Sequence, residues 1–264
     1  MAHIEIENLT FSYPSAGRPS LSDVSLTIRR GEYVVLCGKS GSGKTTLLRH
    51  LKSVLAPHGK RSGDIRINGV SLKDMSQRDQ AAKVGFVMQN PDDQIVTDKV
   101  WHELAFGLES LGCDQKTMRA RVAEMACYFG IQDWFHRDVA NLSGGQKQLL
   151  NLASIMAMQP EILILDEPTN GLDPSGIHEI RNLVKSLPSL YDCTVLISSH
   201  MLSEIELIAD DIGILNHGRL LFEGSMNDLR QYALQSGFAA DNLEDVFLSM
   251  VEKDNMDRKQ RAKL

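Results

Sequence analysis

The stretch that most constrains this chain is a glycine-rich octapeptide at residues 38–45, with the sequence GKSGSGKT. It matches the pattern G-x-x-x-x-G-K-[ST], which defines a P-loop. The apolar run at residues 33–37 predicts a buried strand before the loop, and residues 46–51 predict the start of a helix after it. Because a P-loop requires a strand, a glycine loop and a helix in this order, the sequence predicts an α/β fold around a nucleoside triphosphate site.

The chemistry of the loop follows from its residue types. Gly38, Gly41 and Gly43 let the backbone turn tightly and bring bare N–H groups to one point. The helix that follows adds a partial positive charge at its N-terminus. The Lys44 ammonium is expected against the outer phosphates, and the Thr45 hydroxyl on a Mg²⁺ that bridges two of them. By itself the motif indicates only a nucleoside triphosphate, because kinases, GTPases and ATPases share it.

Composition sets broad limits on the chain. Its 264 residues, 42% of them hydrophobic, suffice for one large domain or two small ones. The net charge of −6 gives no indication of nucleic-acid binding. The first residues lack the features of a signal peptide, and no apolar run reaches the roughly 18 residues of a membrane span. The four cysteines have no metal-ligand spacing and are expected to be buried free thiols in a reducing cytosol.

The first ninety residues read mainly as β structure. Alternating apolar residues predict strands within residues 3–37, and Tyr13 lies in a turn between them, either packed on the surface or stacked on a purine. A strand pair with a turn at residues 68–69 follows the P-loop helix. The buried strand at residues 84–88 ends at Gln89, which is either a surface polar group or a side chain that reaches a metal or water beside the phosphates.

From about residue 98 to residue 160 the pattern becomes helical. Trp101, Leu104, Ala105 and Leu108 recur at helical spacing, as do Val122, Met125, Ala126 and Phe129, and both faces are expected to be core. Since this stretch interrupts the alternation of strands and helices, we interpret it as an inserted helical subdomain.

A second helix start that could bind an anion lies within that segment. The stretch LSGGQ at residues 142–146 precedes a helix predicted from 147 to 157, with Ser143 as a plausible N-cap. The adjacent Gly144 and Gly145 leave open N–H groups, which makes this helix end a candidate anion site. A capped helix start with a glycine turn would be the favoured interpretation if the P-loop were absent.

Two carboxylates follow the apolar strand at residues 162–165. Asp166 is expected to hold a metal or its water, and Glu167 to polarise an attacking water as general base. Asp173 is expected to be the N-cap of the next helix, with Pro174 at the first helical position. His200 follows the apolar strand at 194–198, where it is a satisfied polar group or a sensor of the γ-phosphate.

The end of the chain is predicted to be a β-hairpin followed by a helical region. Residues 212–222 predict a β-hairpin with Asn216 and His217 in the turn, and residues 225–264 are predicted to be helical. Leu243, Val246, Phe247 and Met250 form one apolar face of that region. The basic residues at 258–263 are expected to be a solvated tail, with contact to anionic lipid as the alternative.

Taken in order, these motifs resemble the ATPase subunits of ABC transporters over nearly all of residues 3–224. The LSGGQ stretch is the most specific part of the resemblance, because other P-loop families lack it. The resemblance implies a P-loop NTPase core with a mainly parallel sheet, an N-terminal antiparallel β subdomain and an inserted α-helical subdomain. It implies an ATPase domain at residues 1–224, with its helical subdomain at about 98–160, and a C-terminal helical extension with a basic tail at 225–264.

The resemblance also implies the site. Tyr13 resembles the adenine-stacking aromatic, Gln89 the lid glutamine, Asp173 the aspartate of the dimer-interface loop and His200 the switch histidine. The implied contacts to ATP are Tyr13, Gly38, Lys39, Ser40, Gly41, Ser42, Gly43, Lys44, Thr45, Thr46, Ser143, Gly144, Gly145, Gln146 and Asp173. The implied catalytic residues are Glu167, His200, Gln89 and Lys44, and the implied Mg²⁺ ligands are Thr45, Gln89 and Asp166.

In this family two cassettes pair head-to-tail, with ATP between the P-loop of one and the LSGGQ stretch of the other. The resemblance therefore implies a second ATPase chain, the same or homologous, and transmembrane subunits driven through the region after Gln89. The chain would lie at the cytoplasmic face of the membrane, attached only through partners and without nucleic acid.

Two subfamilies are represented in the sequence. Residues 89–94 and 105–108 resemble the ATPases of energy-coupling-factor importers of vitamins and of metal ions such as cobalt or nickel. Residues 198–205 and 243–248 resemble antibiotic-export ATPases. Because the coupling segment lies in the first part, we favour the importer. The alternatives are an exporter ATPase, a soluble ABC-type ATPase and a catalytically silent cassette, and the presence of Glu167 and His200 argues against the last.

Overall fold

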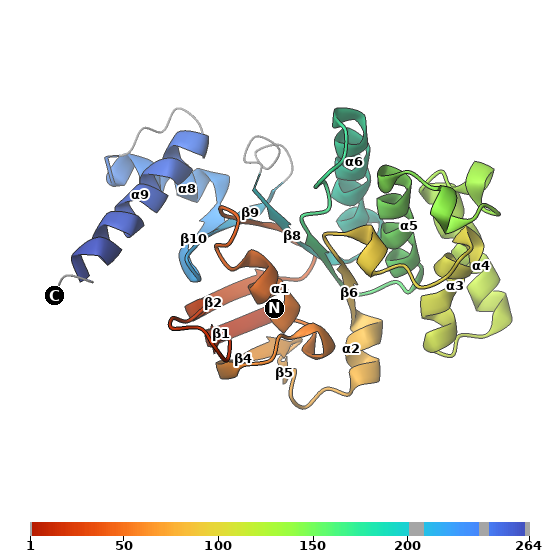
Figure 1. The fold of residues 1–264 in the computed structure, drawn as a ribbon, viewed down its shortest axis with the longest axis horizontal. Coiled ribbons are helices and arrows are strands. Elements are labelled where there is room, and N and C mark those ends of the chain that lie inside the picture. Colours follow the sequence, from red (N-terminus) through yellow and green to blue (C-terminus); the bar gives the residue numbers. More distant parts are fainter. Residues whose placement is uncertain (1, 201–208, 238–242, 262–264) are drawn as a thin grey trace. The chain divides into compact units, whose positions relative to one another are not determined.

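The structure is a computed structural model that describes residues 2–200, 209–237 and 243–261. Contacts within the chain divide it into two compact units. The first comprises Met1–Asp74 and Ile197–Leu264, and the second comprises Met75–Leu196. The chain passes from the second unit back to the first within strand β8 (Thr194–Ser199). Figure 1 shows the ribbon and labels most of the helices and strands named below.

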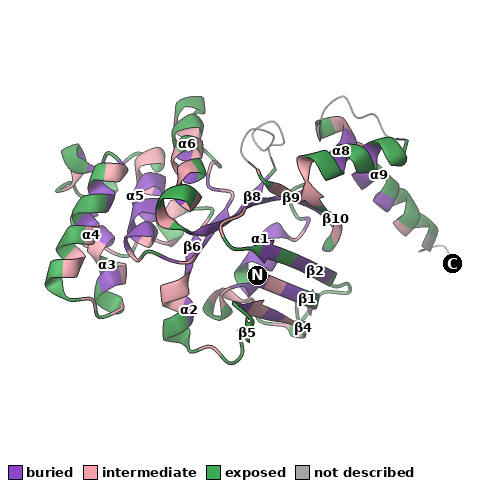
Figure 2. Ribbon diagram, turned by 180° about the vertical axis from the view of Figure 1, so that it is seen from behind, coloured by how far each residue is buried: buried purple, intermediate pink, exposed green. Residues whose placement is uncertain are grey.

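The first unit contains an antiparallel sheet of order β2-β1-β4-β5. Its strands are β1 (Ala2–Ser12), β2 (Leu21–Arg29), β4 (Lys60–Ile67) and β5 (Val70–Ser71). Ile6 of β1 lies opposite Leu26 of β2 and Ile65 of β4, and all three side chains are buried. The alternation of apolar and polar residues in the sequence therefore correctly predicted that one face of this sheet is buried (Figure 2).

The same unit carries the strand that leads into the P-loop. Every residue of β3 (Tyr33–Cys37) is buried, and β3 pairs in parallel with β9 (Asp211–Asn216). Helix α1 (Lys44–His50) and the short 3-10 helix η1 (Ser53–Leu55) follow the loop. A hairpin connects β9 to β10 (Arg219–Ser225).

Two helices complete the first unit, α8 (Met226–Gln235) and α9 (Leu243–Arg261). Val246, Phe247 and Met250 are buried on one face of α9, as the sequence predicted, and α9 contacts β9. Of the exporter-like residues 198–205, those at 201–205 lie outside the described residues, as does the side chain of Leu243.

The second unit contains the parallel strand pair β6 (Val84–Val87) and β7 (Ile162–Asp166). Helix α2 (Gln77–Lys83) leads into β6. The segment between the two strands contains η2 (Pro91–Asp93), α3 (Val100–Ser110), α4 (Gln115–Tyr128), η3 (Gln132–Trp134), η4 (Val139–Asn141) and α5 (Gly144–Ala157). Helix α6 (Pro174–Tyr191) follows β7. Parallel strands joined by a helical insertion, together with the N-terminal antiparallel sheet, confirm the predicted fold class; the domain limits at 98–160 and 224 stay a prediction.

Helix α5 is the centre of the helical segment. It contacts α3, α4, β6 and η2, and nine of its residues are buried (Figure 2). The face predicted for α4 is correct, since Val122, Met125, Ala126 and Phe129 are all buried.

The face predicted for α3 was wrong at one end. Leu104 and Leu108 are fully buried, but Trp101 is 43% exposed and the carboxylate residue Glu103 is buried instead. The reason is a set of backbone bonds, because a Glu103 oxygen accepts from the N–H groups of Val96 (3.2 Å) and Thr97 (2.9 Å). Those bonds compensate for the burial of the carboxylate.

The cysteine prediction was half right. All four cysteines are free; Cys37 and Cys193 are buried, whereas Cys113 is partly exposed and Cys127 is exposed. Within the described ranges, no helix has the length and apolar character needed to cross a bilayer.

Candidate active site

The P-loop occupies the turn between β3 and α1. Two of its glycines require left-handed backbone, with φ of 77° at Gly41 and 108° at Gly43. Gly38 is needed for space, since a Cβ there would lie 2.4 Å from the Leu215 carbonyl oxygen. These constraints explain why glycine stands at three positions of the loop, and they leave N–H groups free of side-chain cover.

Lys44 is the first residue of α1 and is only 4% exposed. Its ammonium donates to the carbonyl oxygens of Gly38 (2.8 Å) and Lys39 (3.3 Å), so the side chain folds back over the loop. A cation held against the loop backbone by neutral carbonyls is placed to meet an anion bound by the same loop.

One polar atom of the loop fits an anionic ligand directly. The Ser42 hydroxyl oxygen is buried and has no hydrogen-bond partner within the described ranges. A buried hydroxyl without a partner costs about 1–3 kcal/mol. A phosphate oxygen would satisfy this group, so the residues present fit a nucleotide.

Tyr13 lies at the predicted turn after β1 and is 41% exposed. Its ring packs edge-on against Phe11, with ring centroids 4.9 Å apart, and its hydroxyl lies 3.3 Å from the Thr46 hydroxyl of α1. The ring is therefore packed against Phe11, as one interpretation of the sequence had it, and stacking on a purine stays a prediction. The contact with Thr46 ties the ring to the helix that begins at the P-loop.

The second unit brings the predicted catalytic carboxylate and the predicted lid glutamine together. Asp166, the last residue of β7, is 1% exposed, and Glu167 follows with a left-handed φ of 45°. The Gln89 amide donates to a Glu167 carboxylate oxygen over 3.4 Å. Gln89 follows β6, and because β6 and β7 are parallel neighbours, their carboxyl ends meet at the same edge. Non-glycine residues with positive φ store strain, which is typical of functional positions.

The loop after Gln89 is held by side chains that the sequence did not single out. Gln94 accepts from the Met88 N–H (2.8 Å) and donates to the Phe86 carbonyl (3.0 Å), so it closes the loop back onto β6. Lys147, near the start of α5, forms a 2.6 Å ion pair with Asp92. Nothing in the polar sequence of residues 89–94 predicted these partners.

The LSGGQ stretch forms the start of α5. Ser143 is the N-cap, as predicted, and exchanges hydrogen bonds with Gln146: its hydroxyl accepts from the Gln146 N–H (3.2 Å) and its own N–H donates to the Gln146 side chain (3.0 Å). The helix begins at Gly144 rather than at residue 147, because this capping box organises the glycines into the first turn. Ser143 and Gly144 are exposed, so the positive end of the helix dipole faces outward.

Asp173 and His200 lie where the sequence placed them. Asp173 is exposed and caps α6 by accepting from the Gly176 N–H (2.8 Å), with Pro174 at the first helical position. His200 follows directly after β8 and is exposed. The structure therefore gathers Tyr13, Thr46 and the P-loop in the first unit, and Gln89, Asp166 and Glu167 in the second.

Comparison with known proteins gives the family. The ABC transporter family matches residues 21–170, more than half of the chain. A Bacillus cereus protein assigned as an ABC transporter ATP-binding protein is 44% identical over 225 residues. That match covers 85% of this chain but only 41% of the relative, so the chain spans about two fifths of that relative's length.

Two further matches cover most of this chain and most of the matched protein. The energy-coupling factor transporter ATP-binding protein EcfA1 of Latilactobacillus sakei is 39% identical over 229 residues, which are 87% of this chain and 80% of the relative. The structure of cbiO1 from Clostridium perfringens, described as part of the ABC transporter complex cbiONQ, matches with a TM-score of 0.77 and 29% identity, covering 89% of this chain and 95% of that one.

A third solved structure supports the fold alone. A dimeric ATP-binding cassette in a post-hydrolysis state, bound to ADP and Pi, matches with a TM-score of 0.75 and 24% identity over 84% of this chain and 98% of that one. The family resemblance drawn from the motifs is thus confirmed. The chain belongs to the ABC transporter family and carries the fold of its ATP-binding ATPases.

Proposed function

We propose that this chain is the ATP-binding and ATP-hydrolysing subunit of an ABC transporter, which energises transport by membrane subunits. The observation that carries the proposal is the pairing of Gln89 with Glu167 at the end of β7. A carboxylate in strained backbone, held by an amide beside the buried Asp166, is suited to activating water. The P-loop supplies the anion site that such a reaction needs.

The proposed division of labour uses the residues predicted from the sequence. Glu167 takes the proton of the attacking water, Gln89 orients that water, and Lys44 stabilises the charge that develops on the transferred phosphoryl group. His200 senses the γ-phosphate. Tyr13 stacks on the adenine, while the loop residues 38–46 hold the phosphates through backbone N–H groups and the Ser42 hydroxyl.

We assign Thr45, Gln89 and Asp166 as the residues that hold Mg²⁺. Hydroxyl, amide and carboxylate oxygens are ligands that this ion accepts, and the ion neutralises phosphate charge when it is bound. The buried position of Asp166 supports the assignment, because a buried carboxylate is stabilised by a nearby cation.

The second half of each site comes from another cassette in this proposal. Ser143, Gly144, Gly145, Gln146 and Asp173 of one chain would contact the nucleotide held by the P-loop of the other, so that ATP closes a head-to-tail pair and hydrolysis reopens it. The outward-facing start of α5 supports this role, since its free N–H groups can bind a phosphate from another molecule. The partner is the same chain or a homologous one.

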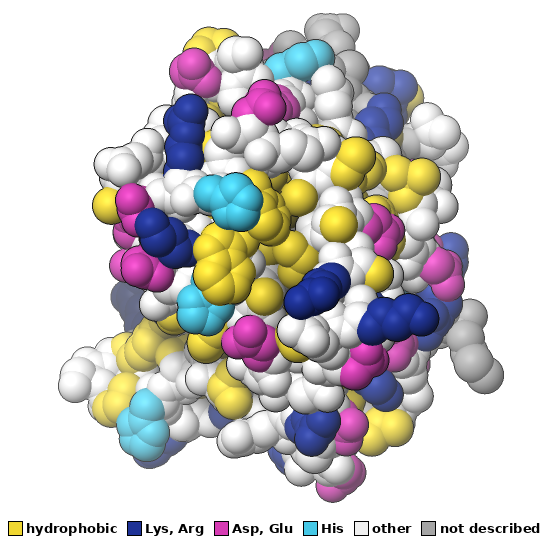
Figure 3. Space-filling model, turned by 90° about the vertical axis from the view of Figure 1, so that its right-hand side faces the viewer, with side chains coloured by type: hydrophobic (Ala, Val, Ile, Leu, Met, Phe, Trp, Pro, Cys, Tyr) yellow, Lys and Arg dark blue, Asp and Glu magenta, His cyan; other side chains and the backbone are white. Residues whose placement is uncertain are grey.

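The proposed contact with the membrane subunits lies on α3 and the loop before it. Val96, Trp101 and Phe106 are large apolar side chains that are 64%, 43% and 42% exposed, and all three lie within one short segment of the chain. Figure 3 shows hydrophobic side chains gathered on the face of the molecule that carries α3. The patch directly follows the loop that begins at Gln89, which supports transmission of closure from the site to a docked partner. In this way the chain would sit peripherally at the cytoplasmic face of the membrane.

We further propose uptake of a vitamin or metal ion as the transport reaction. The support is the importer-like sequence at residues 89–94 and 105–108, together with the 39% identity to an energy-coupling factor ATP-binding protein.

The experiment that tests the proposal measures two properties of Glu167→Gln. We expect ATP hydrolysis to fall at least about 100-fold, the usual loss when a general base is removed, while ATP binding is retained. We expect its mass in solution to change from monomer to dimer on addition of Mg-ATP if the chain pairs with itself. Glu179→Gln, an exposed carboxylate on α6, is the matched control and is expected to hydrolyse ATP like wild type.

Each outcome is decisive for one step. Wild-type turnover by Glu167→Gln refutes the general-base role. ATP binding without dimerisation means that a different ATPase chain completes the site. No ATP binding by the wild-type chain refutes the proposed function as a whole.

A further inference from the structure

The turn between β9 and β10 lies between the P-loop and the C-terminal helix. His217 and Gly218 form its two central positions, with φ of 45° and 75°. Positive φ at both central residues is typical of a two-residue type I′ hairpin turn. The turn therefore consists of four residues, 216 to 219, whose contacts go to two different parts of the first unit.

Three of the four turn residues bind α9. The Asn216 amide donates to the Asp254 carboxylate (2.8 Å) and to the Asn255 side chain (3.3 Å). Arg219 lies 3.5 Å from the other Asp254 oxygen, and Arg258 donates to the His217 carbonyl (3.3 Å). Asp254 thus receives contacts from both strands of the hairpin at once.

The fourth turn residue binds the P-loop. The Gly218 N–H donates to the Ser42 carbonyl over 2.7 Å, and the Gly218 carbonyl accepts from the Ser22 N–H over 2.7 Å. The approach is close enough that a Cβ on Gly218 would lie 2.2 Å from the Ser20 carbonyl oxygen. The turn is consequently fixed against the loop, with little room to move.

This bond sets the direction of a phosphate-binding group. The peptide that joins Ser42 to Gly43 is planar and trans, so its N–H points opposite to its C=O. Because Gly218 holds the Ser42 carbonyl, the Gly43 N–H is aimed away from the turn. Gly43 precedes the first residue of α1, where N–H groups of a P-loop cradle phosphate.

The bond between Asn216 of the turn and Asp254 of α9 is buried. Asn216 is 4% exposed and Asp254 is 8% exposed, so their bond is a buried, charge-assisted one. Loss of Asp254 would leave the buried Asn216 amide with only its longer bond to Asn255, which favours displacement of the turn.

We propose that Asp254 and Asn216 are positioning residues for the P-loop, through which the C-terminal helix sets the affinity for nucleotide. Asp254 holds the two strands of the hairpin, the hairpin holds Gly218 on Ser42, and that bond holds the Gly43 N–H in its binding orientation. The inference rests on the proposed function, because it requires that the P-loop binds a nucleotide.

The test compares ADP affinity by calorimetry with thermal stability, using the full chain. We expect Asp254→Ala to weaken ADP binding about tenfold, which corresponds to about 1.4 kcal/mol. Asp254→Asn keeps an oxygen that can accept from Asn216 and should restore affinity to within about threefold of wild type. Asp257→Ala removes an exposed carboxylate from the same helix and serves as the matched control, with wild-type affinity expected.

Two further readouts separate positioning from stability alone. In steady-state hydrolysis the KM for ATP should rise with little change in kcat, since the altered group binds phosphate but performs no proton transfer. The double variant Asn216→Ala with Asp254→Ala should lose less affinity than the sum of the two single losses, because the two residues share one bond. If Asp254→Ala does not fold, Asn216→Ser, whose shorter side chain cannot span the gap, gives the same measurement.

The outcomes that overturn the inference are distinct from those that overturn the proposed function. An Asp254→Ala chain with a lowered melting temperature but wild-type ADP affinity would show that α9 only stabilises the fold. Wild-type protein that fails to bind ADP would remove the proposed function first, and the inference with it.

Discussion

Replacing Gly218 with alanine should damage this protein more than the same change at an equivalent turn. Gly69 offers the comparison, because it occupies the second central position of the β4–β5 turn with φ of 77°, against 75° at Gly218. The two sites differ in the room available for a Cβ atom. A Cβ on Gly69 meets nothing within 4 Å, whereas a Cβ on Gly218 meets the Ser20 carbonyl oxygen at 2.2 Å and the Leu21 Cα at 3.0 Å.

The expected magnitudes follow from that difference. Left-handed backbone costs alanine about 1–2 kcal/mol at either site. The contact at Gly218 is with backbone atoms, which cannot rotate away, so overpacking adds about 1–3 kcal/mol there. For a chain of this size the extra cost corresponds to about 2–12 °C in melting temperature.

The assay is thermal unfolding of Gly69→Ala and Gly218→Ala beside wild type, followed by ADP titration of each at a temperature where all are folded. Gly218→Ala should also bind ADP more weakly, since the displaced turn can no longer hold the Ser42 carbonyl. Equal melting temperatures for the two variants would refute the steric reasoning. A large destabilisation with unchanged ADP affinity would refute the link between turn and P-loop.

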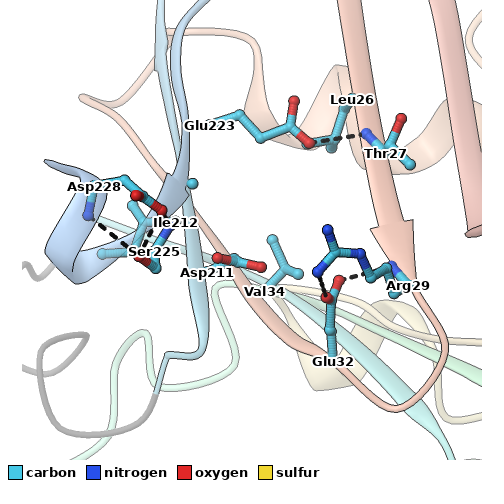
Figure 4. Close-up of a pocket in the computed structure, with 11 residues that line it drawn as sticks. Leu26, Thr27, Arg29, Glu32, Val34, Asp211, Ile212, Glu223, Ser225 and Asp228 are labelled. Atoms are coloured by element: carbon cyan, nitrogen blue, oxygen red, sulfur yellow. Dashed lines mark hydrogen bonds and ion pairs between the residues drawn. The ribbon is translucent and has the colours of Figure 1, made fainter. Parts of the chain in front are cut away.

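Three other changes have defined outcomes. Lys44→Ala should weaken ATP binding by about tenfold to a hundredfold, as expected for loss of charged hydrogen bonds of about 1.5–3 kcal/mol, and calorimetry measures it. Burial, opposed in part by the bond from the Thr27 N–H, raises the pKa of Glu223, which lines a cavity of about 420 Å³ with other carboxylates (Figure 4). The folded state therefore holds this proton more tightly than the unfolded one, so the free energy of unfolding should fall as pH rises from about 4.3 through the folded pKa, and Glu223→Gln should flatten that slope in urea titrations. Burial raises the pKa of Cys37 to about 12, so a thiol reagent should modify the exposed Cys127 rapidly and Cys37 only on unfolding, as peptide mass mapping can show.

Much of the fold could be predicted from the sequence where local pattern and burial agree. The strand before the P-loop, the pair β6 and β7, and the N-caps Ser143 and Asp173 all follow from short-range chemistry. The proximity of Gln89 and Glu167 could also be predicted from the sequence, because each follows a buried strand and parallel strands have their carboxyl ends at one edge of the sheet.

The wrong face of α3 arose where side-chain bonds to the preceding loop outweighed the periodic pattern. Trp101 fits the apolar period of α3, but periodicity contains no information on the backbone N–H groups that Glu103 satisfies. The predicted turn at Asn216 and His217 is correct, since both belong to the four-residue turn 216–219 between β9 and β10, although its central residues are His217 and Gly218.

The P-loop itself illustrates why a complete motif does not determine a complete site. Its residues specify a tight turn with bare N–H groups, but each peptide plane can rotate unless its carbonyl is held. The Ser42 carbonyl is held by Gly218, a residue that in sequence marks only a hairpin turn. Two chains with the same eight residues can therefore differ in nucleotide affinity if their hairpin turns are held differently. In this chain that support comes from α9, which lies outside the 21–170 segment matched to the family, so the strength of nucleotide binding should depend on residues that the family pattern does not include.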